Sequence, residues 1–126
     1  MPKNIYVKNR FKNNLSREHL DFFKALEMSH QSGDYFFTHA GIDPEKPLDQ
    51  QDERDLLWIR GRFLDSRKDF GRVVIHGHTP VYEPEKRKNR IGIDTGAVYG
   101  RKITALMLDG ERQEFLSIDA NNSKTC

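Results

Sequence analysis

The 126-residue sequence predicts an α/β domain built on a mixed sheet. One amphipathic helical segment is followed by a strand, a second helical segment and then mostly strands. Two runs, "YFFTHAG" and "RVVIHGHTP", are rich in aromatic or β-branched residues and end at glycine or proline, as strands do. A "DGE" turn at 109–111 separates the last two apolar runs, so the later part of the sheet is predicted to be antiparallel.

In the first half of the chain, residues 1–14 are polar and basic without a period, and they are predicted to form a polar arm. Ser16 is the predicted N-cap of an amphipathic helix over 17–29, where apolar residues recur at helical spacing. The run 35–41 is predicted to be a strand. The segment 54–66 has apolar residues at roughly helical spacing and is predicted to be a short helix, or a turn followed by one.

The second half is predicted to be mostly β-structure. Strands are expected at 72–76, 91–94, 104–108 and 114–118, with a hairpin-like connection before the second of them. Residues 119–126 are predicted to be a flexible tail.

Composition limits the classes of function. The net charge is +2, from 21 basic and 19 acidic residues, so nothing indicates a nucleic-acid partner or an anionic membrane surface. The single cysteine, Cys126, excludes a disulfide framework within the chain and favours a reducing compartment. No window of 18 apolar residues is present, and the N-terminal residues lack the apolar stretch of a signal peptide. The expectation is a soluble, cytoplasmic protein.

Histidine follows a predicted strand in two places. His39 comes directly after the first apolar run, and His78 follows the second. Ligands tend to bind at strand ends in α/β sheets, and histidine is the commonest metal ligand. Each histidine could instead be a hydrogen-bonded turn residue. Their 39-residue separation matches no compact zinc motif, so spacing leaves both interpretations open.

Four sequence blocks carry a family resemblance, "FTHAGIDP", "DLLWIRGRFL", "VVIHGHTPV" and "NRIGIDTGAVYGRKITAL". In this order they resemble serine/threonine-type phosphoprotein phosphatases, which are bacterial members of the calcineurin-like metallophosphoesterase superfamily. The resemblance runs from about Leu15 to about Leu116, and it places the domain at 15–118. It implies an αββα β-sandwich flanked by helices, with two metal ions (manganese, iron or zinc) at the strand ends.

The resemblance also implies roles for the histidines. His39 and His78 look like two ligands of the same metal ion. In the wider superfamily the second block is often Gly-His-x-His, whose last histidine reaches the other metal ion. Here Pro80 stands at that position, as is usual in the phosphatase branch. His76 precedes the glycine and is predicted either to line the site or to be structural.

Arg60 resembles the arginine that binds the substrate phosphate, which suits the two-pronged geometry of a guanidinium. Arg62 is the neighbouring candidate, which could instead be a solvated surface residue, and we favour Arg60. Trp58 is predicted to pack in the core beside the arginine rather than to serve as a binding platform. Tyr99 is expected to line the loop that borders the site, and Asp94 to cap that loop as a hydrogen-bond acceptor.

Three motifs of the family are not found in this chain: Gly-Asp-x-His-Gly, Gly-Asp-x-x-Asp-Arg-Gly and Gly-Asn-His-Glu. In relatives they supply the other ligands, the bridging aspartate and the proton-donating histidine, and they precede the first helix seen here. The chain therefore resembles the C-terminal half of such a phosphatase. We assign no catalytic residue and expect at most one weak metal site. The mechanism implied for the family is in-line attack on phosphorus by a hydroxide that bridges the two metal ions.

Three functional hypotheses remain. The first is a metal-dependent phosphatase that acts on a phosphoprotein or a small phosphoester. The second, a close variant, is part of a diadenosine-tetraphosphate hydrolase. The third is a non-catalytic fragment, or a partner that completes another phosphatase half by binding a complementary N-terminal half. Whether this chain alone is an enzyme is left open, and alone it is expected not to hydrolyse phosphoesters at an enzymatic rate.

Overall fold

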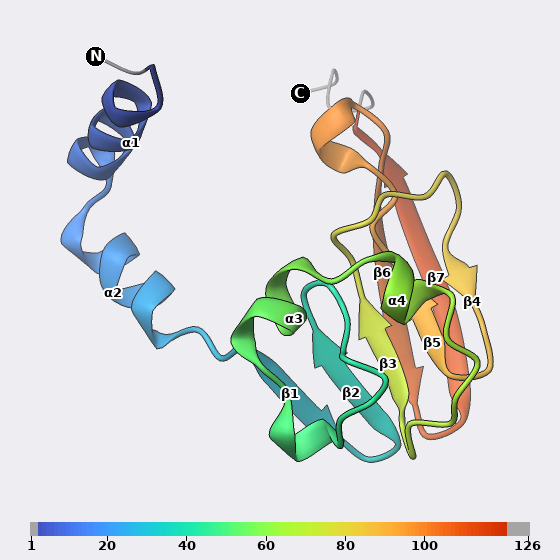
Figure 1. Cartoon of the computed structure of the whole chain (residues 1–126). Helices are drawn as coiled ribbons and strands as arrows, with labels where there is room; N and C mark the ends of the chain where they lie inside the picture. Colours follow the sequence, from blue (N-terminus) through green and yellow to red (C-terminus); the bar gives the residue numbers. More distant parts are fainter. Residues whose placement is uncertain (1–2, 121–126) are drawn as a thin grey trace.

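The computed structural model describes residues 3–120, which form two packed sheets and four α-helices (Figure 1). The helices are α1 Lys3–Asn14, α2 Arg17–Ala25, α3 Glu53–Trp58 and α4 Gly61–Leu64, and 3-10 turns lie at Leu48–Gln50 and Ala97–Tyr99. The strands are β1 Ser29–Ser32, β2 Tyr35–Thr38, β3 Val73–His76, β4 Glu85–Lys86, β5 Arg90–Gly92, β6 Lys102–Asp109 and β7 Arg112–Asp119.

The larger sheet has the strand order β1-β2-β3-β5-β4. Strands β2, β3 and β5 are parallel, whereas β1 and β4 pair antiparallel at the two edges. The predicted mixed sheet is therefore present. Because β2 and β3 are parallel neighbours, the residues that follow them lie at the same edge of the sheet.

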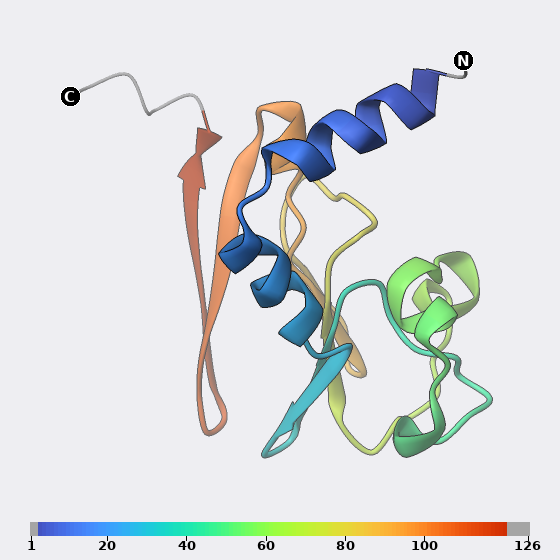
Figure 2. The same cartoon turned by 90° about the vertical axis from the view of Figure 1, so that its left-hand side faces the viewer.

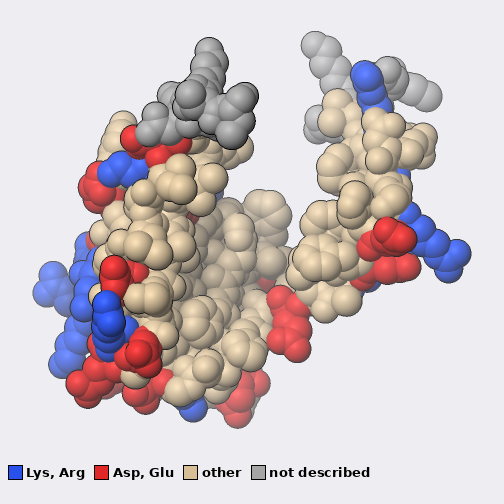
Figure 3. All heavy atoms as spheres, turned by 180° about the vertical axis from the view of Figure 1, so that it is seen from behind, with Lys and Arg blue, Asp and Glu red and all other residues tan. Residues whose placement is uncertain are grey.

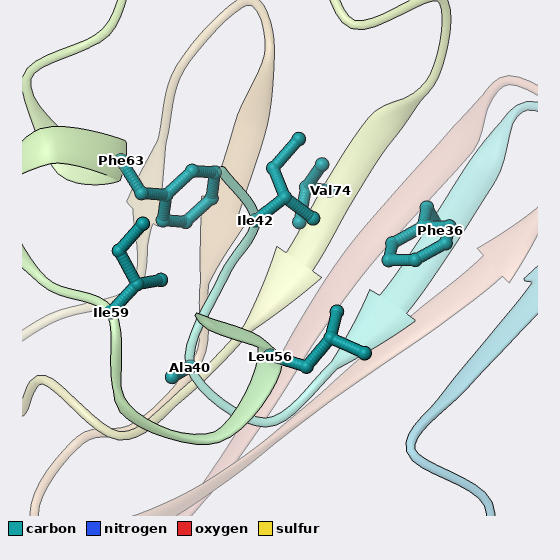
Figure 4. Packing of buried hydrophobic residues seen from close by; sticks show 7 residues of the cluster. All are labelled: Phe36, Ala40, Ile42, Leu56, Ile59, Phe63 and Val74. Atoms are coloured by element: carbon teal, nitrogen blue, oxygen red, sulfur yellow. The ribbon is translucent and has the colours of Figure 1, made fainter. Parts of the chain in front are cut away.

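One face of the larger sheet is covered by α3, α4 and the loop after β2 (Figure 4). Phe36 and Val74 point from the strands toward Leu56, Ile59 and Phe63. Side chains alternate between the two faces of a strand, so the neighbours of Phe36 and Val74 face the other way. This cluster anchors the segment between α3 and α4, because Ile59 at the junction is buried.

The opposite face packs on the β6–β7 hairpin. Tyr35, Ile75 and Ile91 form the buried centre of this second cluster, and Leu106 and Phe115 of the hairpin pack against it. The hairpin is antiparallel, with Asp109 paired to Arg112 around the predicted turn. Two stacked sheets with helices on the outer face of one agree with a partial metallophosphoesterase-like sandwich.

The outer face of the hairpin is apolar but open. Four large apolar side chains there are exposed: Ile103, Met107, Leu116 and Ile118. Seen from behind, a broad surface of the body facing α1 and α2 carries few charged side chains (Figure 3). The exposed apolar residues of β6 and β7, named here as the outer hairpin face, have no covering element among residues 3–120.

Helices α1 and α2 stand away from the two sheets (Figures 1 and 2). No residue of α2 is buried, and its Phe22 and Phe23 are exposed. Ser16 caps α2 as predicted, by accepting a hydrogen bond from the His19 backbone N–H. None of the helices in the described part of the chain is long and apolar enough to cross a bilayer.

The structure corrects several predicted boundaries. Residues 3–14 form α1 rather than an irregular arm. The helix predicted over 17–29 ends at Ala25, because residues 29–32 pair with β2 as strand β1. The helix predicted over 54–66 is interrupted at Arg60, whose backbone is far from helical. Strand β7 extends to Asp119, and the Ala120 N–H donates to the Arg101 carbonyl over 2.8 Å, while residues 121–126 of the predicted tail lie outside the described residues.

Candidate metal and phosphate site

The structure brings His39 and His78 together. His39 follows β2 and His78 follows β3, and His39 Nε2 lies 3.1 Å from His78 Nδ1. The Gly77 N–H donates to the His39 carbonyl over 2.8 Å, which ties the two strand ends together just beyond the sheet. The proximity of the two imidazoles, which the family resemblance implied, is therefore present, while their role as ligands stays a prediction.

The backbone at His78 is unusual. His78 has a φ of 65°, and no other non-glycine residue among 3–120 has a positive φ. Such a conformation is uncommon for a residue with a side chain and is often found at functional sites. Beside it, a Cβ on Gly77 would lie 3.4 Å from Asp94 Cβ and 3.7 Å from the His39 carbonyl oxygen. The turn is thus in van der Waals contact with the neighbouring strand ends.

Electrostatics keep His78 in its neutral form. Burial lowers the pKa of His78, and the positive charge of Arg60 and the proximity of His39 lower it further, although Asp94 opposes the shift. A neutral imidazole is the form that binds a metal ion. His78 Nε2 and the neighbouring Thr79 hydroxyl are buried and have no hydrogen-bond partner within the described part of the chain.

The histidine pair fits two ligands of one ion. Two nitrogens 3.1 Å apart, each about 2.0–2.1 Å from an ion, subtend an angle of about 100° there, which is within reach of tetrahedral or octahedral coordination. The unpartnered polar atoms at the same turn also indicate that this region accommodates a further group. Residues 3–120 contain no group of three or more histidine, cysteine, aspartate or glutamate side chains that could hold a metal ion. The described residues therefore supply two ligands and no complete site.

His76 lies behind this pair. It is buried and packs edge-on against the Phe63 ring. Arg90 Nη1 lies 3.2 Å from His76 Nε2, and because arginine is always a donor, Nε2 accepts and Nδ1 carries the proton. Nδ1–H then donates to the Gly77 carbonyl over 3.2 Å. Burial lowers the pKa of His76 to about 4, and the charge of Arg90 contributes, so His76 is neutral near pH 7.

Arg90 is a buried cation that the sequence reasoning missed. Only 2% of Arg90 is exposed. Its guanidinium binds Glu85 Oε2 at 3.0 Å and the Leu64 carbonyl at 3.2 Å, in addition to His76. A buried charge is tolerated when it is paired in this way. The arginine in "NRIGID", set among apolar residues, was the available signal.

The two histidines open onto a pocket of about 340 Å³. His39, His76 and His78 line one side of it, and Asp94 lines it from the strand end after β5. Asp94 Oδ1 accepts the Gly96 N–H at 3.0 Å, which is the loop-capping contact predicted for it. Tyr99 is exposed in the 3-10 turn and is not among the residues that line this pocket.

Arg60 and Arg62 differ in their partners. Arg62 lies at the surface, and its Nη2 lies 3.0 Å from Asp43 Oδ2 and 3.6 Å from Asp55 Oδ1, so its guanidinium is already engaged in ion pairs. Arg60 is exposed, and its side chain makes no hydrogen bond or ion pair with another residue in 3–120. It lies close enough to His78 to influence its pKa. These contacts favour Arg60 over Arg62 as the anion-binding candidate.

The prediction that Trp58 packs in the core is wrong. Trp58 is 67% exposed at the last position of α3. The centroid of its ring lies 5.8 Å from the centroid of the His78 ring, at an interplanar angle of 89°. The next residue, Ile59, occupies the core position instead, so the indole lies at the site.

Comparison with known proteins found no matching protein-family model. A relative from Oceanobacillus iheyensis, bis(5'-nucleosyl)-tetraphosphatase PrpE [asymmetrical], is 29% identical over 123 residues, which are 84% of this chain and 48% of the relative. A protein of the same name from Anoxybacillus flavithermus is 50% identical over 34 residues, which are 27% of this chain and 14% of that relative. The chain is similar in sequence to bis(5'-nucleosyl)-tetraphosphatases. It spans about half the length of the first of these relatives.

The fold comparison found a likeness to a solved structure. A crystal structure described as a candidate diadenosine tetraphosphatase matches with a TM-score of 0.71 at 18% identity, and the match covers 87% of this chain and 58% of that one. This likeness supports the fold. The comparisons support the metallophosphoesterase part of the prediction, and they favour the diadenosine-tetraphosphate hydrolase alternative over the serine/threonine phosphatase.

Proposed function

We propose that this chain forms part of a metal-dependent hydrolase that cleaves a phosphoanhydride bond of bis(5'-nucleosyl) tetraphosphates. The observation that carries the proposal is the His39–His78 pair. Its nitrogens lie 3.1 Å apart at the ends of two parallel strands, in a chain similar in sequence to proteins named for that activity.

The residues of the site have different proposed roles. His39 and His78 would be the two residues that hold one divalent ion, and burial together with the charge of Arg60 lowers the pKa of His78, which favours its neutral, metal-binding form. A bound ion would polarise a phosphoryl oxygen as a Lewis acid. Hydrolysis joins the oxygen of water to one phosphorus and releases the bridging oxygen on the next phosphate. Arg60 is the residue proposed to neutralise the charge that grows on the phosphate oxygens, because its guanidinium has no hydrogen-bond or ion-pair partner among residues 3–120 and its charge lowers the pKa of His78.

A second proposal concerns completeness. Two histidines leave most coordination positions of an ion to water, which is insufficient for two-metal chemistry. The outer hairpin face is exposed although the inner face of the same hairpin is packed, and the chain covers 48% of its relative. We propose that a complementary half, corresponding to the part of the relative left unmatched, supplies the remaining ligands and covers this face.

The test compares this chain alone with a fusion that carries, upstream of Met1, the part of the Oceanobacillus relative that the match leaves out. Both are assayed with diadenosine tetraphosphate and with a phosphoserine peptide, in manganese, iron or zinc. We expect turnover of the tetraphosphate by the fusion alone, abolished by His78→Ala. Turnover of the peptide without turnover of the tetraphosphate would instead support the serine/threonine phosphatase hypothesis.

In the same fusion, Arg60→Ala is expected to lower turnover by roughly one to three orders of magnitude, as loss of a charge-stabilising donor typically does. Arg62→Ala is the matched control, because Arg62 is already engaged by Asp43 and Asp55. A larger loss from Arg62→Ala than from Arg60→Ala would reverse the assignment.

A further inference from the structure

Trp58 is the chain's single tryptophan, and most of its ring is open to solvent. A residue of this size is normally largely buried, so an exposed indole beside a polar site calls for an explanation. Its position is imposed by the neighbouring residue. Ile59 is buried in the cluster of Figure 4, and α3 ends at Trp58, so the indole is left outside the core.

Three groups of different chemistry meet at this point. The Trp58 ring contacts the His78 ring edge-on at 5.8 Å. Arg60 is two residues further along the chain. Its positive charge is close enough to the His78 imidazole to lower the pKa of that ring. The site thus combines a flat apolar ring, an unpaired guanidinium and two imidazole nitrogens.

We propose that Trp58 is a stacking platform for the nucleobase of a nucleotide whose phosphate is bound by Arg60 and the histidine pair. A 5'-nucleotide joins a flat aromatic base to a phosphate through one ribose, and this pairing of groups matches the pairing of Trp58 with Arg60. The identity of the ligand as a nucleotide rests on the function proposed above. Stacking tolerates any base, since every base has a π-face, so this residue selects nucleotides without selecting among bases.

Other exposed aromatic side chains are less suitable. Tyr82 and Tyr99 are exposed, but the Arg101 guanidinium lies 4.1 Å from the Tyr82 ring centroid and 6.0 Å from that of Tyr99. Arg101 therefore already occupies the face of Tyr82, whereas the ring contact of Trp58 is with the candidate ligand-binding histidine itself.

The experiment uses the tryptophan emission of the whole chain, which reports on Trp58 alone. The chain is titrated with adenosine 5'-monophosphate and, separately, with ribose 5-phosphate, which carries the same sugar and phosphate without the base. We expect saturable quenching by the nucleotide and none by ribose 5-phosphate. By calorimetry, Trp58→Leu should weaken nucleotide binding roughly 5- to 100-fold, the range typical of one stacked base, and leave ribose 5-phosphate binding unchanged.

Two variants serve as controls. Tyr82→Leu removes an aromatic ring of similar exposure and should leave nucleotide binding unchanged. Arg60→Ala should weaken binding of both ligands, because it removes a phosphate contact that they share. Circular dichroism checks that Trp58→Leu remains folded, as expected for a side chain that is 67% exposed.

The outcomes separate this proposal from the proposed function. If the nucleotide causes no saturable quenching across the millimolar range, or binds no better than ribose 5-phosphate, the platform is overturned, and hydrolysis by the fusion protein can still be observed. If the nucleotide quenches Trp58 but the fusion protein does not hydrolyse diadenosine tetraphosphate, the platform stands and the proposed function fails.

Discussion

At the scale of single residues, the site depends on one turn. The positive φ of His78 directs its imidazole to His39, and the turn is held by the Gly77 N–H bond to the His39 carbonyl and by His76 beneath it. Strain of this kind persists only where surrounding contacts outweigh it. Here those contacts come from two adjacent strand ends and from the buried Arg90.

The histidine pair makes a direct prediction about metal binding by the chain as it stands. Zinc or cobalt should bind weakly in a calorimetric titration, because the described residues offer only two candidate ligand nitrogens. Either His39→Ala or His78→Ala should abolish the binding signal. His30→Ala is the matched control, since His30 is an exposed histidine on β1. Binding that survives loss of His78 but not of His30 would contradict the assignment.

His76 predicts a dependence of stability on pH. Its folded pKa is about 4, below the ordinary value of 6.5, because burial and Arg90 disfavour the protonated ring. The resulting stability is fully present above pH 6.5 and is lost as the pH falls from 6.5 toward 4, by an amount on the order of 3 kcal/mol. Urea unfolding at a series of pH values measures this loss.

His76→Gln serves as the control for that series, because glutamine keeps a polar side chain that does not titrate. The variant should be less stable than the parent at pH 7, and its stability should change much less between pH 6.5 and pH 4. Equal pH dependence of the two proteins would show that other groups, and not His76, cause the acid loss.

At the scale of elements, the loop after β2 owes its path to a close approach. A Cβ on Gly41 would lie 2.1 Å from Phe63 Cδ1, and Gly41 has a φ of 154°. The fully buried Phe63 ring of α4 therefore packs directly on the glycine backbone. This contact connects the "HAG" segment, which carries His39, with the helix that follows Arg60.

Gly41→Ala is accordingly expected to be destabilising by about 2–4 kcal/mol, because Phe63 cannot move without disturbing the core. Gly33→Ala is the matched control. It also has a positive φ, 53°, but no atom lies within 4 Å of its added Cβ, so its cost is about 1 kcal/mol. Thermal unfolding of both variants checks the difference, and equal losses would mean that Phe63 relaxes more readily than its burial indicates.

At the scale of the whole molecule, the outer hairpin face and the exposed apolar residues of α2 are open to solvent. Exposed apolar surface of this extent marks an interaction site or a tendency to associate. Figure 3 shows that the surface of the body toward α1 and α2 carries few charged side chains, and the proposed complementary half would bind on this side.

This arrangement predicts opposite effects of one substitution in two contexts. Ile118→Lys should reduce self-association of the isolated chain in analytical ultracentrifugation, because Ile118 is 70% exposed and the change removes apolar surface. In the fusion that carries the complementary half, the same change should lower the thermal unfolding midpoint, because a charge would then be buried. Glu111→Lys in the hairpin turn is the control for added charge. A fusion unaffected by Ile118→Lys would show that this face stays open.

The sequence by itself determined the alternation of helices and strands, the hairpin around 109–111 and the histidines at two strand ends. These features depend on neighbouring residues: β-branched runs, turn residues and periodic apolar positions act over a few residues of chain. The pairing of His39 with His78 followed from the family resemblance rather than from spacing, which had left the question open.

Only the tertiary structure decided which side chains of the motifs face inward. Trp58 lies outside and Ile59 inside because the helix ends between them. Helices of four to six residues are too short to show a clear apolar period, so tertiary packing decides which of the two side chains is buried. Arg90 is buried because Leu64, His76 and Glu85, up to 26 residues away, together satisfy its guanidinium. Contacts between such distant segments form only when the strands are brought side by side, so no local pattern could have located them.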